Sequence, residues 1–412
     1  MRTIFVYLHR WVGLTIAAFL FVTGLTGAII SWDHELDAWL NPHLVETQTQ
    51  GTPHPVLEII QSIEQKYPEM EVLYAPLITE KGHALELFVA PKTNPETGEL
   101  YPAHFNQIFI DPVSKKELGT RYWGTVWPIT TENFVSFLYV LHYSLHIPEM
   151  WGIDRWGVWL LGIIALLWTL DCFSGFILTL PRRQRKKPAA QSLKSWWQRW
   201  KPAWLIRWRA GGYKLNFDLH RAFSLWTWGL LFVVAFTAFS LNLYREVFYP
   251  VMTLVSDVTP SPYDSRIPTA DNQYITPLIS KAAIIAKAKE QAGTHGWQEP
   301  ASSIFYARNF GIYRIEFSNP EDGHGAGGVG HKALYFDSSD GRELGSFEPW
   351  KGTAADIFVQ AQFPVHSGRI LGLPGRILIS GMGLVIAMLS VTGVIIWLKK
   401  RKARNLKKRK TP

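Results

Sequence analysis

Residues 7–14 read YLHRWVGL and residues 218–225 read DLHRAFSL, and both stretches place a His-Arg pair at the start of a long apolar run. Four apolar runs occur in the chain, and each reaches the roughly 20 residues that an α-helix needs to cross a bilayer core. They extend over Trp11–Trp32, Trp156–Leu180, Phe217–Tyr244 and Leu371–Leu398. In a chain of 412 residues, of which 47% are hydrophobic, this pattern predicts a polytopic α-helical membrane protein rather than two or three soluble domains.

Lysine and arginine are concentrated in two segments that contain no acidic residue. Residues 181–214 hold 11 basic side chains and residues 399–410 hold 9. The long segments 34–150 and 245–365 instead contain more acidic than basic residues, 15 against 6 and 14 against 10. Because basic residues near helix ends mark the cytoplasmic side, we predict cytoplasmic termini and two large external segments. This topology explains the net charge of +9 through contact with the lipid membrane, without a nucleic-acid partner.

The chain repeats its own organisation with a period of about 210 residues. In each half an LHR motif and an apolar helix precede a soluble stretch, a second His-bearing segment and a second apolar helix. The soluble stretches share an amphipathic helical run, at 55–68 and 275–293. They also share a strand followed by an Asp-led turn, QIFIDPVSKKELG (107–119) and ALYFDSSDGRELG (333–345). We therefore predict two small α+β units, each with a helix packed on an antiparallel sheet.

Histidines lie at the ends of the apolar runs and fall into two groups. His9 and His220 are expected at the cytoplasmic ends, whereas His142, His146 and His366 are expected near the external ends. A helix of some 20 residues separates the two depths by roughly 30 Å. Two histidines on different helices at one depth could bind the iron of a haem between them. Two such haems would form a path for electrons across the membrane.

Arg10 and Arg221 directly follow the histidines of the first group and are placed to bind haem propionates. An alternative remains open, in which each His-Arg pair only anchors its helix to lipid phosphates. Asp171 lies deep in the second apolar run, where an acidic residue is a candidate for function. It could relay protons, pair with a buried histidine, or bond a hydroxyl such as that of Thr26 or Thr237.

Several motifs in this order resemble the PepSY-associated transmembrane helix proteins. They are LHRWVGL…TGLTGAII, LHYSL, DLHR, PVHSGRILGLPGR and the Asp-led turns, and they extend over nearly the whole chain. The resemblance implies four transmembrane helices, as two repeated pairs, with two periplasmic PepSY-like domains. The family includes iron-regulated proteins and ferric-siderophore reductases that carry b-type haem.

The resemblance also assigns the haem ligands. The family histidines correspond to His9, His142, His220 and His366. The second segment departs from the family pattern, because LHY replaces LHR and His146 follows four residues later, so the choice between His142 and His146 stays open. FTAFS in the third helix replaces the usual Thr-Gly, and we expect this difference to alter packing around the pair formed by His9 and His220.

These observations favour a haem-containing oxidoreductase of the bacterial inner membrane that reduces a periplasmic ferric chelate, such as a siderophore, and releases Fe(II). The expected cofactors are two b-type haems. Because no flavin module is fused to the chain, the electron donor would be separate, a cytoplasmic flavoprotein or a quinol. The alternatives are a non-enzymatic periplasmic binding or regulatory module, and a siderophore or iron transporter.

The predicted boundaries follow from the apolar runs and the charge distribution. They are a first transmembrane helix (1–33), a first PepSY-like domain (34–131), a His-bearing segment with the second helix (132–180), a basic cytoplasmic loop (181–214), a third helix (215–244), a second PepSY-like domain (245–363), a His-bearing segment with the fourth helix (364–398) and a basic cytoplasmic tail (399–412).

Overall fold

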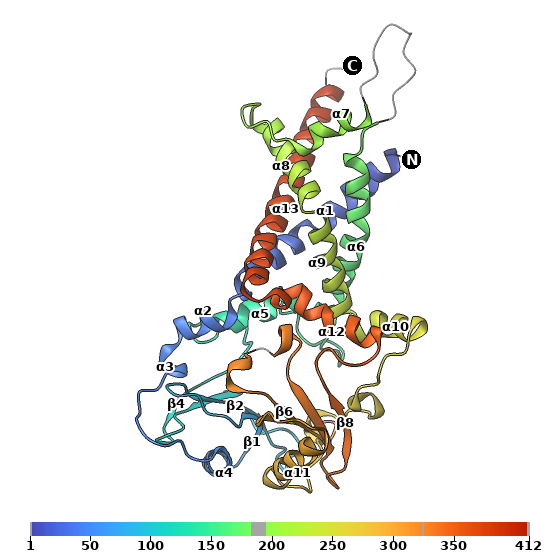
Figure 1. Ribbon diagram of the computed structural model, residues 1–412. Coiled ribbons are helices and arrows are strands. Elements are labelled where there is room, and N and C mark those ends of the chain that lie inside the picture. The colour runs from blue at the N-terminus through green and yellow to red at the C-terminus, as the bar shows by residue number, and fades with distance from the viewer. Residues whose placement is uncertain (1, 183–194, 324, 410–412) are drawn as a thin grey trace. The chain divides into compact units, whose positions relative to one another are not determined.

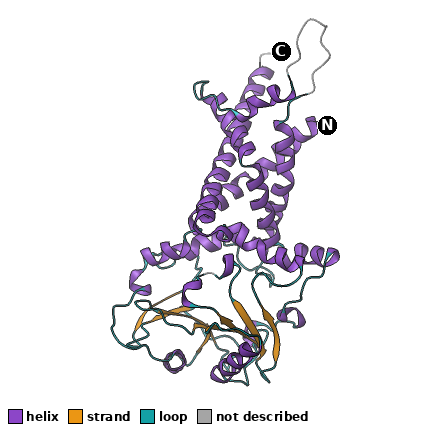
Figure 2. Cartoon of the chain, viewed as in Figure 1, coloured by secondary structure: helices purple, strands orange, loops and turns teal. Residues whose placement is uncertain are grey.

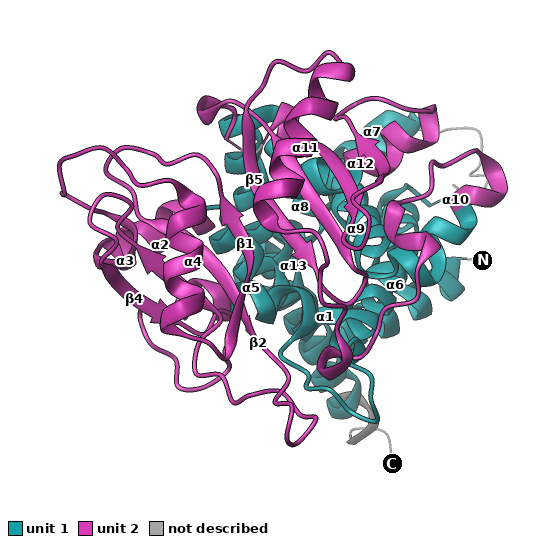
Figure 3. Cartoon of the chain, turned by 90° about the horizontal axis from the view of Figure 1, so that it is seen from below, with its two compact units in different colours: residues 1–32, 138–251, 362–412 teal, residues 33–137, 252–361 magenta. Residues whose placement is uncertain are grey.

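The computed structural model describes residues 2–182, 195–323 and 325–409 (Figure 1). The chain forms two compact units, and each draws on both halves of the sequence (Figure 3). The helical unit comprises residues 1–32, 138–251 and 362–412, and the sheet unit comprises residues 33–137 and 252–361. Parts of the predicted basic loop (residues 183–194) and basic tail (residues 410–412) lie outside the described residues.

The helical unit contains the apolar runs recognised in the sequence. Its helices, two of which begin in the sheet unit, are α1 (Arg2–Ile30), α5 (Phe134–Ser144), α6 (Trp156–Thr179), α7 (Trp196–Trp200), α8 (Gly212–Trp226), α9 (Trp228–Asn242), α12 (Ala354–Ser367) and α13 (Gly372–Arg409). Among the described residues, three helices are long and apolar enough to cross a membrane, and α8 with α9 makes a fourth span if this bent pair counts as one.

The third apolar run is not the continuous helix that its composition predicts. The axis bends by 72° between α8 and α9, at Thr227. The hydroxyl of Thr227 donates to the carbonyl of Phe223 at 2.7 Å, and the backbone of Thr227 leaves the helical region. The departure of the Thr227 backbone from helical geometry ends α8 and lets α9 begin in a new direction. The fourth run forms a longer helix than its composition predicts, since α13 continues into the basic tail as far as Arg409.

Small residues let α1 and α13 approach closely. A Cβ added to Gly24 would lie 2.8 Å from the carbonyl oxygen of Gly383, and a Cβ on Gly383 would lie 2.3 Å from that of Gly24. Membrane helices associate through such small residues, which let their backbones approach. Helix α13 also meets α6 and α9 in an apolar cluster that contains Cys172, Ala235 and Met382.

The sheet unit holds one eight-stranded antiparallel sheet, drawn in orange in Figure 2. Its strand order is β4-β3-β2-β1-β5-β6-β7-β8. The strands are β1 (Met70–Pro76), β2 (Leu85–Pro91), β3 (Gln107–Ile110), β4 (Glu117–Arg121), β5 (Ala301–Ala307), β6 (Ile312–Phe317), β7 (Lys332–Asp337) and β8 (Glu343–Phe347). Its helices are α2 (Asp33–Leu40), α3 (Pro42–Val45), α4 (Val56–Lys66), α10 (Tyr249–Val255) and α11 (Lys281–Thr294), and α10 begins in the helical unit.

The two repeats are joined where the sequence analysis expected two separate sheets. Strand β1 pairs with β5, with Tyr74 opposite Phe305 and Ala75 opposite Ile304. This pairing covers the edge that each four-stranded repeat would otherwise expose. Helices α4 and α11 contribute to the same core as the central strands, through Ile59 and Ile284 among others. The repeats therefore form one continuous core rather than two.

The amphipathic runs form helices as predicted, although the second begins later than expected. Helix α11 starts at Lys281 instead of residue 275 because Ser280 caps it, accepting a hydrogen bond from the backbone NH of Ala283. The residues before it are not helical. The backbone NH groups of Leu278 and Ile279 donate to the carbonyl of Ser338, in the turn that follows β7.

The Asp-led turns that end β3 and β7 are organised by their carboxylates. Asp111 accepts hydrogen bonds from the backbone NH groups of Val113 and Ser114. Asp337 accepts from the backbone NH of Ser339 at 2.8 Å and from the guanidinium of Arg266. Burial would raise the pKa of the Asp337 carboxyl, but these bonds outweigh it and lower that pKa to about 2. Each turn thus depends on an ionised aspartate.

We predict that the second half of the sheet loses stability in acid. The pKa of Asp337 in the folded protein lies below its unfolded value of about 3.9. Its contribution to the free energy of unfolding is therefore present above about pH 4 and is lost as the pH falls toward 2. Asp337→Asn is expected to remove about 2 kcal/mol at pH 7. Hydrogen exchange of the β7 amides should quicken accordingly, whereas the exposed Asp257→Asn should leave it unchanged. Equal exchange in both variants would contradict this role.

Candidate functional site

Four histidines of the helical unit form two pairs, and each pair takes one ring from each half of the chain. The rings of His9 (α1) and His220 (α8) have centroids 6.2 Å apart, with 56° between their planes. The rings of His142 (α5) and His366 (α12) are also 6.2 Å apart, with 50° between their planes. We call these the first pair and the second pair. The sequence prediction that the histidines fall into two groups thus agrees with their positions.

The two pairs lie at different levels of the bundle. His9 belongs to the first pair, and Thr26, 17 residues later on the same helix, contacts His142 of the second pair at 3.1 Å. At 1.5 Å per residue, these positions on α1 are about 25 Å apart. His146 follows the end of α5, where its backbone has a positive φ of 53°. His142, rather than His146, is therefore the ring that pairs with His366.

In all four histidines, Nδ1 contacts an oxygen on a neighbouring helix. The contacts are His9 with Oδ2 of Asp171 at 2.9 Å, His142 with Oγ1 of Thr26 at 3.1 Å, His220 with Oγ1 of Thr392 at 3.0 Å and with the carbonyl oxygen of Leu389 at 3.1 Å, and His366 with Oγ1 of Thr237 at 3.0 Å. An oxygen in this position fixes the orientation of the ring and the nitrogen that carries the proton.

The threonine hydroxyls determine which tautomer these rings adopt. Thr26 donates its hydroxyl hydrogen to the carbonyl of Val22 at 2.8 Å, and Thr237 does the same to Val233. A hydroxyl has only one hydrogen to donate, so with that hydrogen engaged it accepts a hydrogen bond from the imidazole Nδ1–H. In His142 and His366 the opposite nitrogen, Nε2, then keeps its lone pair. A carboxylate and a carbonyl oxygen, which also accept, favour the same tautomer in His9 and His220, so each pair has two ring nitrogens that can act as metal ligands.

Glycine beside these oxygens makes room for the rings. A Cβ on Gly27, next to Thr26, would lie 2.8 Å from Cε1 of His142. A Cβ on Gly393, next to Thr392, would lie 3.1 Å from Cε1 of His220, and one on Gly175 would lie 3.3 Å from Cε1 of His9. The dipeptides Thr26-Gly27, Ser174-Gly175 and Thr392-Gly393 are thus places where one helix receives a histidine of another.

The separation within each pair suits one metal ion between the rings. With metal–nitrogen bonds of about 2 Å, an ion bound to one nitrogen of each ring would hold the centroids about 6 Å apart. Among the described residues, no group of three or more His, Cys, Asp or Glu side chains is placed to hold a metal ion. Two protein ligands per site suit a metal whose other ligands belong to a macrocycle, as in haem with two axial histidines.

A cavity of about 480 Å³ surrounds the first pair and has apolar walls with a basic rim. Its basic lining residues are Arg2, Arg10, Arg182, Arg221, Lys400 and Arg404. Nε of Arg10 is buried and has no hydrogen-bond partner among the described residues. An apolar planar group with carboxylates at its edge would match both the walls and the orphaned guanidinium nitrogen. The residues around the first pair therefore fit a haem.

The two predicted propionate-binding arginines differ in their surroundings. Arg10 stacks on the rings of Tyr7 and Trp11, at 4.5 and 5.1 Å from their centroids. Arg221 instead donates to the fully buried Asp218 at 3.0 Å, although its Nε is also buried without a partner. Sequence reasoning did not identify Arg2, Lys400 or Arg404, because they face the cavity only after α1 and α13 are folded.

Asp171 does not bond Thr26 or Thr237, the two hydroxyls considered for it in the sequence. Those threonines serve the second pair, whereas Asp171 bonds His9 of the first pair and accepts from the hydroxyl of Ser174. FTAFS, in the third apolar run, supplies Thr237 to His366. We had expected the departure from Thr-Gly to affect the first pair. The structure shows instead that it lies beside the second pair.

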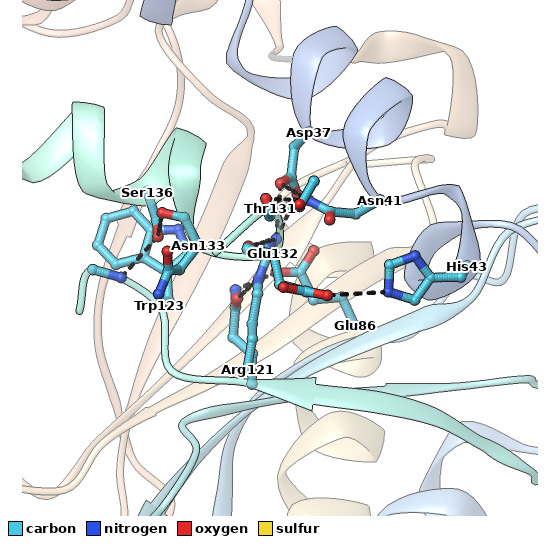
Figure 4. Close-up of polar contacts among 12 residues, drawn as sticks. Asp37, Asn41, His43, Glu86, Arg121, Trp123, Thr131, Glu132, Asn133 and Ser136 are labelled. Atoms are coloured by element: carbon cyan, nitrogen blue, oxygen red, sulfur yellow. Dashed lines mark hydrogen bonds and ion pairs between the residues drawn. The ribbon is translucent and has the colours of Figure 1, made fainter. Parts of the chain in front are cut away.

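The sheet unit contains a separate polar cluster around Arg121, at the end of β4 (Figure 4). Its guanidinium donates to both carboxylate oxygens of Asp37 at 2.8 Å and to the carbonyl of Glu132 at 3.0 Å, so this buried charge is balanced. A cavity of about 600 Å³ lies beside it, and its lining includes His104, Tyr122 and Trp127. Arg121 and Glu132 belong to both, so their hydrogen bond fixes one wall of this cavity.

The fold and the histidine pairs first define a class: this is a membrane protein with up to four apolar spans, two histidine pairs in its helical unit and a separate antiparallel sheet. The chain matches the family model of the PepSY-associated TM region over residues 6–400, and it belongs to this family. No curated protein matches the chain.

We predict that Gly27→Ala displaces His142 and destabilises the helical unit by about 1–2 kcal/mol, because the new methyl group meets a packed ring. Gly13→Ala on the same helix is the matched control, since a Cβ there meets nothing within 4 Å. It should be neutral or stabilise by up to about 1 kcal/mol through helix propensity. Thermal unfolding of both variants in detergent, followed by far-UV circular dichroism, measures the difference. A stabilised Gly27→Ala protein would contradict the close packing.

Proposed function

We propose that this protein is a haem-dependent electron carrier of the bacterial inner membrane that reduces a ferric chelate, such as a siderophore, in the periplasm. The observation that carries the proposal is the 6.2 Å separation between ring centroids in both histidine pairs, together with the oxygen that contacts Nδ1 of each ring. His9 with His220, and His142 with His366, would be the axial ligands of two b-type haems. When bound, haem would supply one-electron redox chemistry.

The protein's own residues hold, orient and insulate these groups. The oxygens on Nδ1 of each histidine fix the ring and the tautomer before a cofactor binds, which lowers the cost of ordering the site. The apolar cluster that contains Cys172, Ala235 and Met382 would insulate the first haem, since Cys172 also lines its cavity. Arg10 would bind a propionate of the first haem through a charge-assisted hydrogen bond.

The proposed topology places the two pairs on opposite sides of the bilayer. With four spans arranged as two repeated pairs, the basic segments 181–214 and 399–412 would face the cytoplasm. The first pair would then accept electrons from a separate donor, a flavoprotein or a quinol. The second pair would lie near the periplasm, where the sheet unit would provide two PepSY-like domains. Reduction to Fe(II) weakens the binding of hard oxygen ligands, so the iron would be released.

We place binding of the chelate in the cavity of the sheet unit. Its volume of about 600 Å³ lies within the range of small-molecule sites. Tyr122 and Trp127 offer exposed aromatic faces there, and His104 adds a polar group. This combination suits a chelate with both apolar and polar surface.

Substitution of the ligands tests the haem assignment. Purified protein expressed with ample haem should give a Soret band that shifts on reduction with dithionite, with separate α and β bands. His9→Ala and His366→Ala are each expected to remove about half of the haem, because each leaves one pair intact. His146→Ala is the matched control and should retain both haems, since its ring is not in either pair. Absorbance spectra with a haem assay on the same samples measure the loss.

A wild-type protein without haem absorbance would contradict the proposal and favour a periplasmic binding module. Full haem content in His142→Ala together with loss in His146→Ala would instead move the ligand assignment from α5 to the loop that follows it.

A pair of tryptophan variants tests the proposed chelate site. Trp127 and Trp39 are similarly exposed, at 79% and 76%, but only Trp127 lines the cavity. Trp127→Ala is expected to weaken binding of a ferric hydroxamate siderophore by about tenfold, and Trp39→Ala to leave it unchanged. Titration by isothermal calorimetry gives both dissociation constants. Equal affinity in the two variants would exclude the cavity as the binding site.

A further inference from the structure

The two histidine pairs differ in one respect that their repeat relationship does not predict. Three of the four rings contact neutral oxygens through Nδ1, whereas His9 contacts the carboxylate of Asp171 at 2.9 Å. Asp171 lies three residues before Ser174, as Leu389 lies three residues before Thr392 in the second half. Leu389, at the position equivalent to Asp171, offers His220 its backbone carbonyl oxygen at 3.1 Å and no side-chain acceptor. Among the oxygens that contact Nδ1, the carboxylate of Asp171 therefore distinguishes the first pair from the second.

Asp171 is well placed to act through His9. Its side chain is 8% exposed, and Ser174 donates to its other oxygen, which fixes the carboxylate against the imidazole. A carboxylate on the Nδ1 proton raises the basicity of a metal-bound histidine. In a poorly hydrated site, a negative charge at this distance also favours the more positive state of the metal. Both effects stabilise Fe(III) over Fe(II) and lower the reduction potential.

We infer that Asp171 sets the direction of electron flow, by holding the reduction potential of the haem at His9 and His220 below that of the haem at His142 and His366. This inference rests on the proposed haem binding. One electron would leave the first haem, whose iron changes from Fe(II) to Fe(III), and enter the second, whose iron changes from Fe(III) to Fe(II). No proton transfer is needed. Asp171 is a positioning residue, because it acts through its contact with His9.

A purely structural role makes a different prediction. If Asp171 only oriented His9, an amide that retains a hydrogen-bond acceptor would serve equally well. Asp171→Asn keeps the shape and one acceptor oxygen but removes the charge, whereas Asp171→Glu keeps the charge. The pair of variants therefore separates charge from geometry.

The experiment is a potentiometric titration of the purified full-length protein, followed by absorbance of the α band. His9→Ala identifies the transition of the second haem, which is the one it retains. We expect wild-type protein to show its lower midpoint potential at the first pair. Asp171→Asn should raise this potential by at least about 59 mV, a tenfold change in the ratio of Fe(II) to Fe(III) for a one-electron couple, and leave the other transition in place. Asp171→Glu should stay close to wild type.

A matched control removes a neutral contact from the other pair. Thr26→Ala deprives His142 of its hydroxyl partner and should not move the transition of the first pair.

Three results would overturn the inference: an unchanged midpoint potential in Asp171→Asn, a wild-type first pair with the higher potential, or loss of the first haem from both Asp171 variants, which would show a role in retention alone. If wild-type protein binds no haem, the proposed function itself fails, and the absorbance spectrum reveals this before any titration.

Discussion

The structure of the helical unit depends on one constraint, which is that imidazole rings from different halves of the chain must meet inside an apolar bundle. The four imidazoles are half-buried, and removing such a ring from water is costly unless its polar atoms are bonded. Each of the four rings contacts an oxygen on a neighbouring helix. Those oxygens lie beside small residues, which allow the rings to reach them. Small residues also let α1 and α13 approach closely, at Gly24 and Gly383.

Both units are assembled in the same way, by joining equivalent elements of the two repeats. In the sheet unit, β1 pairs with β5 and the strand order runs symmetrically outward from that junction. In the helical unit, each histidine pair takes one ring from each repeat. Neither half alone would complete a pair or cover its sheet edge, so the repeat is a requirement of the architecture. Asp171 departs from this symmetry, and for that reason it distinguishes two otherwise similar sites.

Much of this arrangement could be predicted from the sequence. Apolar runs of membrane length, the repeat, and the division of the histidines into two groups are all local patterns that hydropathy and spacing reveal. The bend at Thr227 could not be predicted, because the apolar run continues across it and its hydropathy does not record the change of direction. The union of the two sheets depends on strand edges that meet only after folding. The sequence could not decide between His142 and His146, because that decision depends on where α5 ends. It could not reveal the basic residues that line the cavity, because they come together only when the helices pack.

The central claim is that each histidine pair holds one haem through two axial imidazoles, and electron paramagnetic resonance of the oxidised protein at low temperature tests it most directly. Two rings on one ferric iron make it six-coordinate and low-spin. The account predicts two low-spin ferric signals in the wild type, one in His9→Ala and a different one in His366→Ala. A high-spin signal alone, or no ferric haem signal at all, would contradict it.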